Sequence, residues 1–469
     1  MTEKAFTFPK DFKWGSAVWA QGTEGAFDED QKSKTVFEEY ALQNPSRMQQ
    51  GIGPFHTLDW YNRYEDYISY MEELHLNSFR TSISWARLMP DGRNVNQKAV
   101  DYYTSMFKNM AQKNMDVWVV LYWFDMPLHF EKQGGFSNRD IIPLFKDYAS
   151  VCFELFSEYV DIWFVYNEPA VDIMLKYFND RCYPNEINFN KAYQSMYNMV
   201  VAHAEVVKEF KRLNIDSCKI GSVLDIKPVY PRSFHEKDVE AAEIFSLLHD
   251  KSWLSSFIHG VFPEELKEFL RGLNALPRME KHDEALLKEN TIQVLGINHY
   301  FPVRVQAKQH LRNPEAPLQP ESFFDYYDMP GRKMNKYRGW EMYPKAIYDV
   351  LIDIRDHYNN IECYITENGI GVQNEERFKN KEGVIQDDYR IDYVRDYLKQ
   401  CYYAIQEGCQ LKGYHMWSFI DLWSPTNQFL NRYGFVEFHP ETRETRIKKS
   451  GHWFKDVIDQ NGFKKRNSD

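Results

Sequence analysis

Short runs of β-branched and aromatic residues alternate along the chain with longer stretches of helical periodicity. The short runs are bounded by turn residues, which is typical of buried strands. They span residues 12–20, 78–85, 116–124, 161–168, 219–225, 292–300, 363–368 and 412–419. Between them, apolar positions recur at spacings of three and four, as on one face of a helix. Such stretches cover residues 61–74, 139–158, 190–213 and 388–406.

Strands that alternate with helices imply right-handed crossovers and a parallel sheet. Eight such units in one chain predict an α/β fold, a closed (β/α)₈ TIM barrel with long βα loops. Because no linker or composition break divides the sequence, we expect a single domain over residues 1–469. A doubly wound open sheet is the alternative, but no glycine fingerprint follows the first predicted strand.

Two predicted strands end in a glutamate. DIWFVYNEP, at 161–169, runs from a buried strand into Glu168 and Pro169, and the strand is expected to stop at Glu168 because proline cannot donate to a ladder. YITENG places Glu367 before an Asn-Gly turn signal. The active site of a barrel lies at the carboxyl ends of its strands, so both acids would face one another across the mouth. Paired carboxylates are what glycosidic bond cleavage requires, although spacing alone also permits two unrelated strand-end acids.

Composition excludes several other classes of function. The formal net charge of -11 argues against nucleic acid or an anionic membrane surface as a partner. No basic start followed by an apolar run indicates a secretory signal, and the apolar stretch VWVVLYWF at 117–124 is too short to span a bilayer. The six cysteines form no CxxC pair, so neither a disulfide framework nor a zinc site is indicated. We therefore expect a reduced, cytoplasmic protein.

Several motifs occur together in an order that resembles a known family. YNEP and ITENG, with SFRTSISWARLMPDG and FKWGSA, are similar to family-1 glycoside hydrolases, which are retaining β-glycosidases on a (β/α)₈ barrel. The resemblance runs from about Phe8 to beyond Trp453. It implies that Glu168 is the acid/base and Glu367 the nucleophile.

The resemblance also assigns supporting roles. It implies that Asn167 bonds the sugar 2-hydroxyl, that Arg80 lies beside the nucleophile and favours its ionised form, and that Tyr300 orients it. Trp417 matches the ring under the reacting sugar, and Trp340 matches a ring beside the leaving group.

One departure from the family pattern concerns the substrate. Members that cleave plain glucosides carry a glutamate where this chain has Ser424, and a serine there resembles the 6-phosphoglycosidases. A carboxylate would repel a phosphate, whereas a hydroxyl can donate to it. Those relatives add a lysine and a tyrosine; Tyr433 matches the tyrosine, but Asn431 stands at the lysine position. We expect Arg432, or a cation from a neighbouring loop, to supply the charge.

Two further departures affect the sugar site. The family's glutamine is Gly22 here, with Gln21 displaced by one residue, and the family's histidine after the third strand is Trp123. Both family residues bind the 3- and 4-hydroxyls of the sugar. Their loss removes hydrogen-bond partners and adds an aromatic wall, so we expect the reacting sugar to be modified or held in an unusual way.

The sequence leaves three functional hypotheses. The first is a 6-phospho-β-glucosidase, the second an unphosphorylated β-glucosidase or β-galactosidase with a rebuilt sugar site, and the third a non-catalytic carbohydrate-binding protein. The intact acid pair and its supporting residues argue against the third. No cofactor or metal is implied. The expected partner is a small-molecule glycoside or phosphoglycoside, and we allow for a homodimer.

Overall fold

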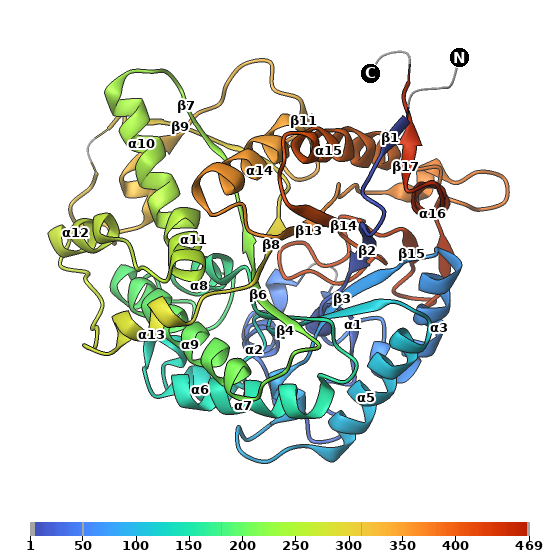
Figure 1. Ribbon diagram of the computed structural model, residues 1–469, viewed down its shortest axis with the longest axis horizontal. Coiled ribbons are helices and arrows are strands. Elements are labelled where there is room, and N and C mark those ends of the chain that lie inside the picture. The colour runs from blue at the N-terminus through green and yellow to red at the C-terminus, as the bar shows by residue number, and fades with distance from the viewer. Residues whose placement is uncertain (1–4, 49–50, 180, 311, 467–469) are drawn as a thin grey trace.

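Eight parallel strands form a closed barrel surrounded by helices (Figure 1). The structure is a computed structural model that describes residues 5–48, 51–179, 181–310 and 312–466. In barrel order the strands are β13 (Cys363–Asn368), β14 (Leu411–Met416), β2 (Lys13–Ala17), β3 (Ser78–Ser82), β4 (Asp116–Tyr122), β5 (Ile162–Asn167), β6 (Lys219–Asp225) and β8 (Val294–Asn298). The predicted TIM barrel is therefore confirmed.

Each predicted run overlaps one barrel strand, but several strands stop earlier than the apolar pattern does. β2 ends at Ala17 and β3 at Ser82, so Trp19 and Trp85 lie beyond their strands although they are buried. β5 ends at Asn167, one residue before the predicted end. The apolar runs extend past the ends of the strands because residues at the barrel mouth are as buried as those inside the sheet.

The longer helices follow the strands and cover the outside of the barrel (Figure 1). They are α3 (Trp60–Glu73), α5 (Gln97–Gln112), α7 (Ile141–Phe156), α9 (Phe189–Arg212), α10 (Glu236–Ser246), α14 (Lys345–His357), α15 (Asp388–Gln406) and α16 (Lys449–Gln460). Four of them, α3, α7, α9 and α15, match the helices expected from the sequence. Their buried residues recur on one face, as α7 shows with Phe145, Ala149 and Cys152.

The long loops beyond the strands carry small sheets of their own. β7 (Val229–Pro231), β9 (Val303–Ala307) and β10 (Phe324–Tyr326) form one sheet, and β11 (Met334–Asn335) with β12 (Trp340–Glu341) forms a short hairpin. β15 (Val436–Phe438) pairs with β16 (Thr445–Ile447). β1 (Ala5–Thr7) pairs with β17 (Gly462–Lys464), which brings the first and last strands of the described chain together (Figure 1).

Packed side chains occupy the barrel interior. Trp118 stacks on His415 with ring centroids 4.1 Å apart, and a ring nitrogen of His415 lies 2.8 Å from the Ser78 hydroxyl. Burial holds the pKa of His415 well below its usual range, so the ring is neutral. This packed layer closes the barrel beneath its mouth.

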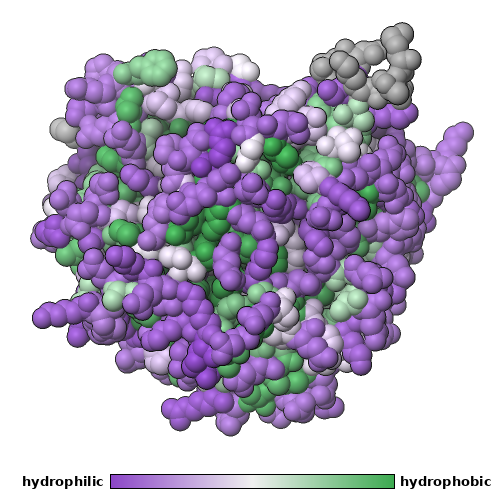
Figure 2. All heavy atoms as spheres, viewed as in Figure 1, coloured by the Kyte–Doolittle hydropathy of each residue, from purple (hydrophilic) through white to green (hydrophobic). Residues whose placement is uncertain are grey.

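The face of the molecule in Figure 2 is mostly hydrophilic, with apolar residues gathered near its middle. Such a surface agrees with the net charge of -11. Among the described residues, none of the helices is both long and apolar enough to cross a bilayer.

Close approach of β6 to β8 gives a test of the barrel packing. A Cβ added at Gly221 would lie 2.2 Å from the carbonyl oxygen of Val294. We expect Gly221→Ala to reduce the free energy of unfolding by about 1–3 kcal/mol, because the backbones must separate. Thermal denaturation would measure this loss. Gly272→Ala is the matched control, since a Cβ added there would meet no atom within 4 Å beyond its chain neighbours and its own helix backbone. An equal effect of both variants would contradict the packing argument.

Candidate active site

Glu168 leaves the barrel wall where β5 ends. Two residues of β5 oppose one of β6 between the Phe164–Gly221 and Asn167–Val223 pairs, and such irregularities re-aim side chains next to active sites. Glu168 itself has a left-handed backbone (φ 48°), which is uncommon for a residue other than glycine. Pro169 then begins helix α8 (Pro169–Tyr177), where its missing N–H is not needed. The Asn-Glu-Pro sequence therefore turns the carboxylate away from the ladder and into the mouth.

Glu367 is placed by a similar irregularity in β13. The pairing with β8 shifts between Ile365 and Glu367, so the end of the strand is kinked. The following Gly369 passes close to the next strand, where an added Cβ would lie 1.9 Å from the carbonyl oxygen of Trp417. The glycine of ITENG thus permits the contact that brings β14 and Trp417 beside Glu367.

A buried network holds Glu367. The guanidinium of Arg80 donates to one carboxylate oxygen, and the hydroxyl of Tyr300 donates to the other at 2.6 Å. The exposed fractions of the Arg80 and Glu367 side chains are 0% and 5%. Arg80 also donates to the Asn167 amide oxygen at 2.7 Å. The structure therefore places Arg80 and Tyr300 beside Glu367, as the resemblance implied, and joins Asn167 to them through Arg80.

Asn298, which the sequence did not single out, connects the two acids. Its amide nitrogen lies 2.8 Å from Oε1 of Glu168 and 3.2 Å from Oδ1 of Asn167. Its amide oxygen accepts a hydrogen bond of 2.8 Å from Thr366, which fixes the direction of the amide. A hydrogen bond from Asn298 also favours the ionised form of Glu367. Asn298 is the last residue of β8, so the strand-end argument used for Glu168 would have found it.

The environments of the two acids differ. Burial raises the pKa of Glu168 well above its usual range, and the negative charges of Glu367 and Asp225 raise it further. Burial also raises the pKa of Glu367, but the charge of Arg80 and the hydrogen bonds from Tyr300 and Arg80 oppose that rise. One proton shared by the pair therefore resides on Glu168, and Glu367 is ionised. Such a division suits a general acid beside a nucleophile.

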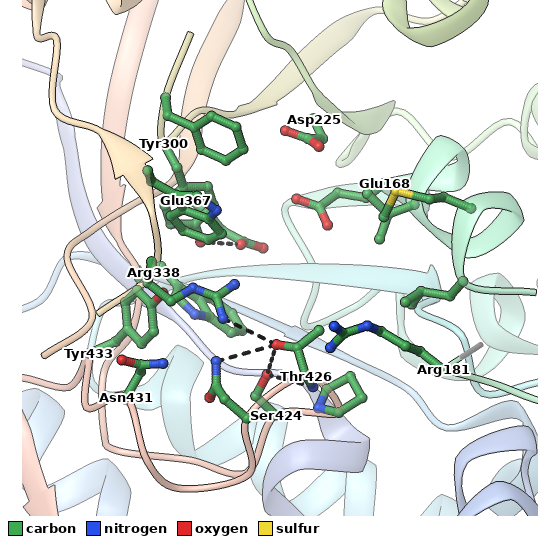
Figure 3. A pocket seen from close by; sticks show the side chains of 18 of the residues that line it. Glu168, Arg181, Asp225, Tyr300, Arg338, Glu367, Ser424, Thr426, Asn431 and Tyr433 are labelled. Carbon is green, nitrogen blue, oxygen red and sulfur yellow. Dashed lines mark hydrogen bonds between the residues drawn. The ribbon is translucent and has the colours of Figure 1, made fainter. Parts of the chain in front are cut away.

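The two acids line a cavity of about 730 Å³ (Figure 3). Eight of the predicted site residues line it, namely Glu168, Glu367, Trp123, Tyr300, Trp340, Trp417, Ser424 and Tyr433. Arg80 and Asn167 are fully buried and contact the acid pair through the bonds described above. The cavity is far larger than a single sugar and has room for a leaving group.

Comparison with known proteins agrees with this arrangement. The family model for glycosyl hydrolase family 1 matches residues 4–463. This chain belongs to glycosyl hydrolase family 1. The 6-phospho-beta-glucosidase GmuD of Bacillus subtilis (strain 168) is 44% identical over 460 residues, which cover 98% of this chain and 99% of that protein. A 6-phospho-beta-galactosidase of Clostridium acetobutylicum is 31% identical over 96% of both chains.

Solved structures show the same family. A family 1 b-glucosidase from Thermotoga maritima superimposes with a TM-score of 0.89 at 30% identity, over 98% of this chain and all of the other. Because family 1 enzymes are retaining glycosidases, the chain is a retaining glycoside hydrolase on a TIM barrel.

The two departures from the family 1 sugar site form one aromatic unit. A Cβ added at Gly22 would lie 1.9 Å from the indole nitrogen of Trp19, so the ring of Trp19 fills the space that a side chain at position 22 would take. The ring centroids of Trp19 and Trp123 lie 6.0 Å apart, and those of Trp123 and Trp417 lie 5.7 Å apart. Trp19, Trp123 and Trp417 all line the cavity, which gives the aromatic wall expected from the sequence.

The structure does not bring Gln21 to this cavity. Its amide nitrogen donates to the Thr35 hydroxyl, and its side chain lies with Glu24, Lys32 and Glu38 beside a separate small hollow. The displaced glutamine therefore does not replace the missing one, because the helical turn α1 (Ala20–Thr23) carries positions 21 and 22 in different directions.

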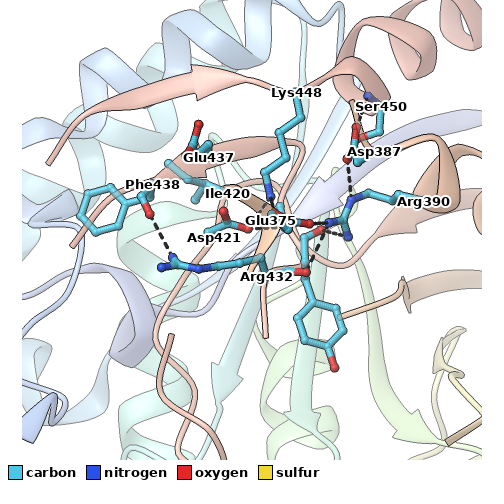
Figure 4. Close-up of polar contacts among 12 residues, drawn as sticks. Glu375, Asp387, Arg390, Ile420, Asp421, Arg432, Glu437, Phe438, Lys448 and Ser450 are labelled. Carbon is cyan, nitrogen blue, oxygen red and sulfur yellow. Dashed lines mark hydrogen bonds and ion pairs between the residues drawn. The ribbon is translucent and has the colours of Figure 1, made fainter. Parts of the chain in front are cut away.

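Arg432 also lies outside the cavity, which corrects the expectation that it faces the sugar phosphate. Its guanidinium donates to the Phe438 carbonyl oxygen at 2.9 Å, on the far side of the segment (Figure 4). Arg432 pairs with Val372 in an isolated antiparallel bridge, and successive residues of extended backbone point to opposite sides. Asn431 and Tyr433 therefore line the cavity while Arg432 faces away from it.

A buried cluster of charges fixes this segment from behind (Figure 4). Arg390 donates to the carbonyl oxygens of Ile370 and Tyr433 at 2.6 and 3.0 Å. Its guanidinium is also paired with Glu375 and Asp387. The cluster thus sets the backbone from which the Tyr433 side chain enters the cavity.

The sequence argument missed four charged residues that line the cavity: Arg181, Asp225, Lys227 and Arg338. Asp225 ends β6, is buried, forms an ion pair with Lys227, and lies in the cavity near Glu168. Its position at a strand end was a usable signal. Arg338 lies in the turn between β11 and β12, and no local pattern distinguishes it from an exposed loop arginine.

Substitution of the two glutamates should separate their roles. We expect Glu367→Gln to lower kcat/KM by more than about a thousandfold on every substrate, because an amide cannot form the glycosyl ester. Glu168→Gln should lower kcat/KM by roughly 10²–10⁴-fold on poor leaving groups and far less on nitrophenyl glycosides, which need little protonation. A series of aryl glycosides of graded acidity measures both effects. Equal losses on every leaving group would contradict the division of roles.

The pH profile should depend on Asp225. Its charge helps to hold the pKa of Glu168 high, so Asp225→Asn should lower that pKa and move the alkaline limb of kcat/KM to lower pH by on the order of one unit. Asp388→Asn, which alters an exposed acid paired with Lys449, is the control and should leave the profile in place. An unmoved alkaline limb in Asp225→Asn would show that this charge does not act on Glu168.

Proposed function

We propose that this chain hydrolyses 6-phospho-β-glucosides with retention of anomeric configuration. The observation that carries the proposal is the side chain at position 424. Ser424 lies in the catalytic cavity and presents a hydroxyl where a family member specific for plain glucosides would present a carboxylate. The B. subtilis relative, 44% identical along nearly the whole chain, is named a 6-phospho-beta-glucosidase.

In the proposed reaction, the Glu367 carboxylate attacks the anomeric carbon while Glu168 donates its proton to the departing glycosidic oxygen. The glycosyl ester of Glu367 is then cleaved by water, whose proton returns to Glu168. Arg80 and Tyr300 hold the Glu367 oxygens, so attack needs no rearrangement of the nucleophile. The negative charge that returns to Glu367 as the ester is cleaved meets the same donors.

Asn167 is proposed to bind the sugar 2-hydroxyl. Its amide oxygen is occupied by Arg80 and Asn298, while its buried amide nitrogen has no partner among the described residues. An unsatisfied buried donor is costly, so a substrate oxygen there would stabilise the complex. Trp417 would lie under the reacting sugar. Trp340, which stacks on Phe301, would flank the leaving group.

The aromatic wall supports recognition through the phosphate rather than through the 3- and 4-hydroxyls. Trp19 and Trp123 replace polar partners of those hydroxyls, so the sugar ring alone would be bound with fewer hydrogen bonds. A 6-phosphate offers three strong acceptor oxygens and can supply the missing orientation. Ser424 and Tyr433 offer hydroxyl donors on the side of the cavity beyond β14 (Figure 3). Burial raises the pKa of Tyr433, so its hydroxyl stays protonated and can donate.

A cytoplasmic location is also proposed. All six cysteines are buried free thiols, and unpaired cysteines are typical of proteins from reducing compartments. The homodimer stays a prediction.

Paired substrates test the proposal. We expect kcat/KM for 4-nitrophenyl β-D-glucoside 6-phosphate to exceed that for the plain nitrophenyl glucoside by at least about tenfold, the effect of one charge-assisted hydrogen bond. Ser424→Glu should reverse the preference, because its carboxylate repels the phosphate and can bind a free 6-hydroxyl. If the unsubstituted enzyme cleaves the plain glucoside as well or better, the phosphoglucosidase proposal is wrong and the unphosphorylated β-glucosidase hypothesis takes its place.

A further inference from the structure

Arg338 is a cation in the catalytic cavity without an acidic partner. It lies in the turn between β11 and β12, with its guanidinium carbon 4.1 Å above the Trp340 ring. Its Nη1 donates to the Thr426 hydroxyl in a long bond of 3.4 Å, and its buried Nε has no partner. Among the described residues, no carboxylate lies within 4.0 Å of this guanidinium. A partly buried, unpaired arginine is a site that can receive an anion.

The groups around Arg338 are hydroxyls and amides rather than acids (Figure 3). The Thr426 hydroxyl oxygen lies 3.2 Å from that of Ser424 and 3.3 Å from the Asn427 amide nitrogen. The hydroxyl–hydroxyl bond is longer than the usual range of about 2.5–3.0 Å, and the bonds from the Asn427 and Arg338 nitrogens are longer than the usual range of about 2.7–3.2 Å. Phosphate oxygens, as stronger acceptors, could replace them with shorter bonds. The site thus combines one charge with neutral donors, as phosphate recognition requires.

The hairpin that carries Arg338 is attached firmly to the rest of the site. The buried Asn335 amide donates to the Gly371 carbonyl oxygen at 3.0 Å, and Gly371 packs against the Tyr433 ring. At the other end of the hairpin, Glu341 accepts two hydrogen bonds of 2.9 Å from Arg304. The position of Arg338 relative to Tyr433 is therefore set by contacts within the protein.

Other cations fit a phosphate at this place less well. Lys227 is paired with Asp225 on the Glu168 side of the cavity, and Arg432 faces away from the cavity. Arg181 lines the cavity, but its side chain is exposed and shows no bond to Ser424 or Thr426. Arg338 alone among these four has a hydrogen bond to the hydroxyl cluster.

We propose that Arg338 provides the positive charge that binds the 6-phosphate of the substrate. The β11–β12 turn thus supplies the cation that relatives supply as a lysine at the position of Asn431. This inference rests on the proposed function. Specificity for the phosphate then resides in two loops, with the charge from the turn after β11 and the hydroxyls from the segment after β14.

The test compares kcat/KM for nitrophenyl glucoside 6-phosphate and for the plain glucoside in four variants. We expect Arg338→Gln to lower the value for the phosphorylated substrate by about ten- to hundredfold and to change the plain one by less than about threefold. The double variant Arg338→Gln/Asn431→Lys should recover most of the loss, because it restores a cation from the other loop. For Arg338→Lys, kcat/KM on the phosphorylated substrate should lie between the values for Arg338→Gln and for the unsubstituted enzyme. Arg432→Gln, the matched control outside the cavity, should keep the ratio of the two substrates.

Competitive inhibition by glucose 6-phosphate gives a second readout that needs no turnover of a phosphorylated substrate. Its inhibition constant should rise in Arg338→Gln and fall again in the double variant, while the thermal midpoint stays near that of the unsubstituted protein. Suppose that the unsubstituted enzyme prefers the phosphorylated substrate, but Arg338→Gln lowers kcat/KM equally for both substrates or for neither. The role proposed for Arg338 is then wrong, and the proposed function stands. If the unsubstituted enzyme shows no preference, the proposed function itself fails.

Discussion

The arrangement of this active site depends on a charge constraint at the barrel mouth. Glu367 is buried and Glu168 is half-buried, and Arg80 is the cation that contacts Glu367. A buried charge without a partner is strongly destabilising, so one arginine can support one ionised carboxylate. Arg80 and Tyr300 select Glu367, and the proton stays on Glu168. Two chemically identical side chains thereby differ in protonation, as their proposed roles of nucleophile and acid require.

The backbone at the mouth is shaped to satisfy this constraint. Both strands that carry the acids are irregular next to them, and Glu168 adopts a left-handed conformation. Such conformations persist when their surroundings determine them, and they cluster at functional sites. Asn298 helps to hold this conformation, since its amide nitrogen donates hydrogen bonds to both Glu168 and Asn167. The aromatic wall provides another part, because the Trp123 ring lies 4.4 Å from the guanidinium carbon of Arg80 and shields the cation from solvent.

The far side of the cavity is supported by a second set of buried charges. Arg390 and Lys448 lie among Glu375, Asp387 and Asp421, and Lys448 contacts both Glu375 and Asp421 (Figure 4). The members come from α15, from the loops after β13 and β14, and from the residue before α16. The same carbonyl oxygens that accept from Arg390 belong to the segments carrying Tyr433 and Gly371. One ionic cluster therefore positions both loops around the Ser424 hydroxyl, while its charged side chains lie outside the lining of the catalytic cavity.

The sequence by itself determined the barrel and the pair of acids at its mouth. Alternation of apolar runs with amphipathic stretches located all eight strands, because burial of a parallel strand on both faces requires such runs. Glu168 and Glu367 followed from polar residues at strand ends, and the same rule would have reached Asn298 and Asp225. Only the tertiary structure decided where Gln21, Arg432, Trp19 and Arg338 lie. A loop side chain takes its direction from contacts distant in sequence, as Arg338 does from the bond of Asn335 to Gly371. Local periodicity determines which residues enter the barrel wall, whereas the charges that line the cavity depend on how separate loops pack together.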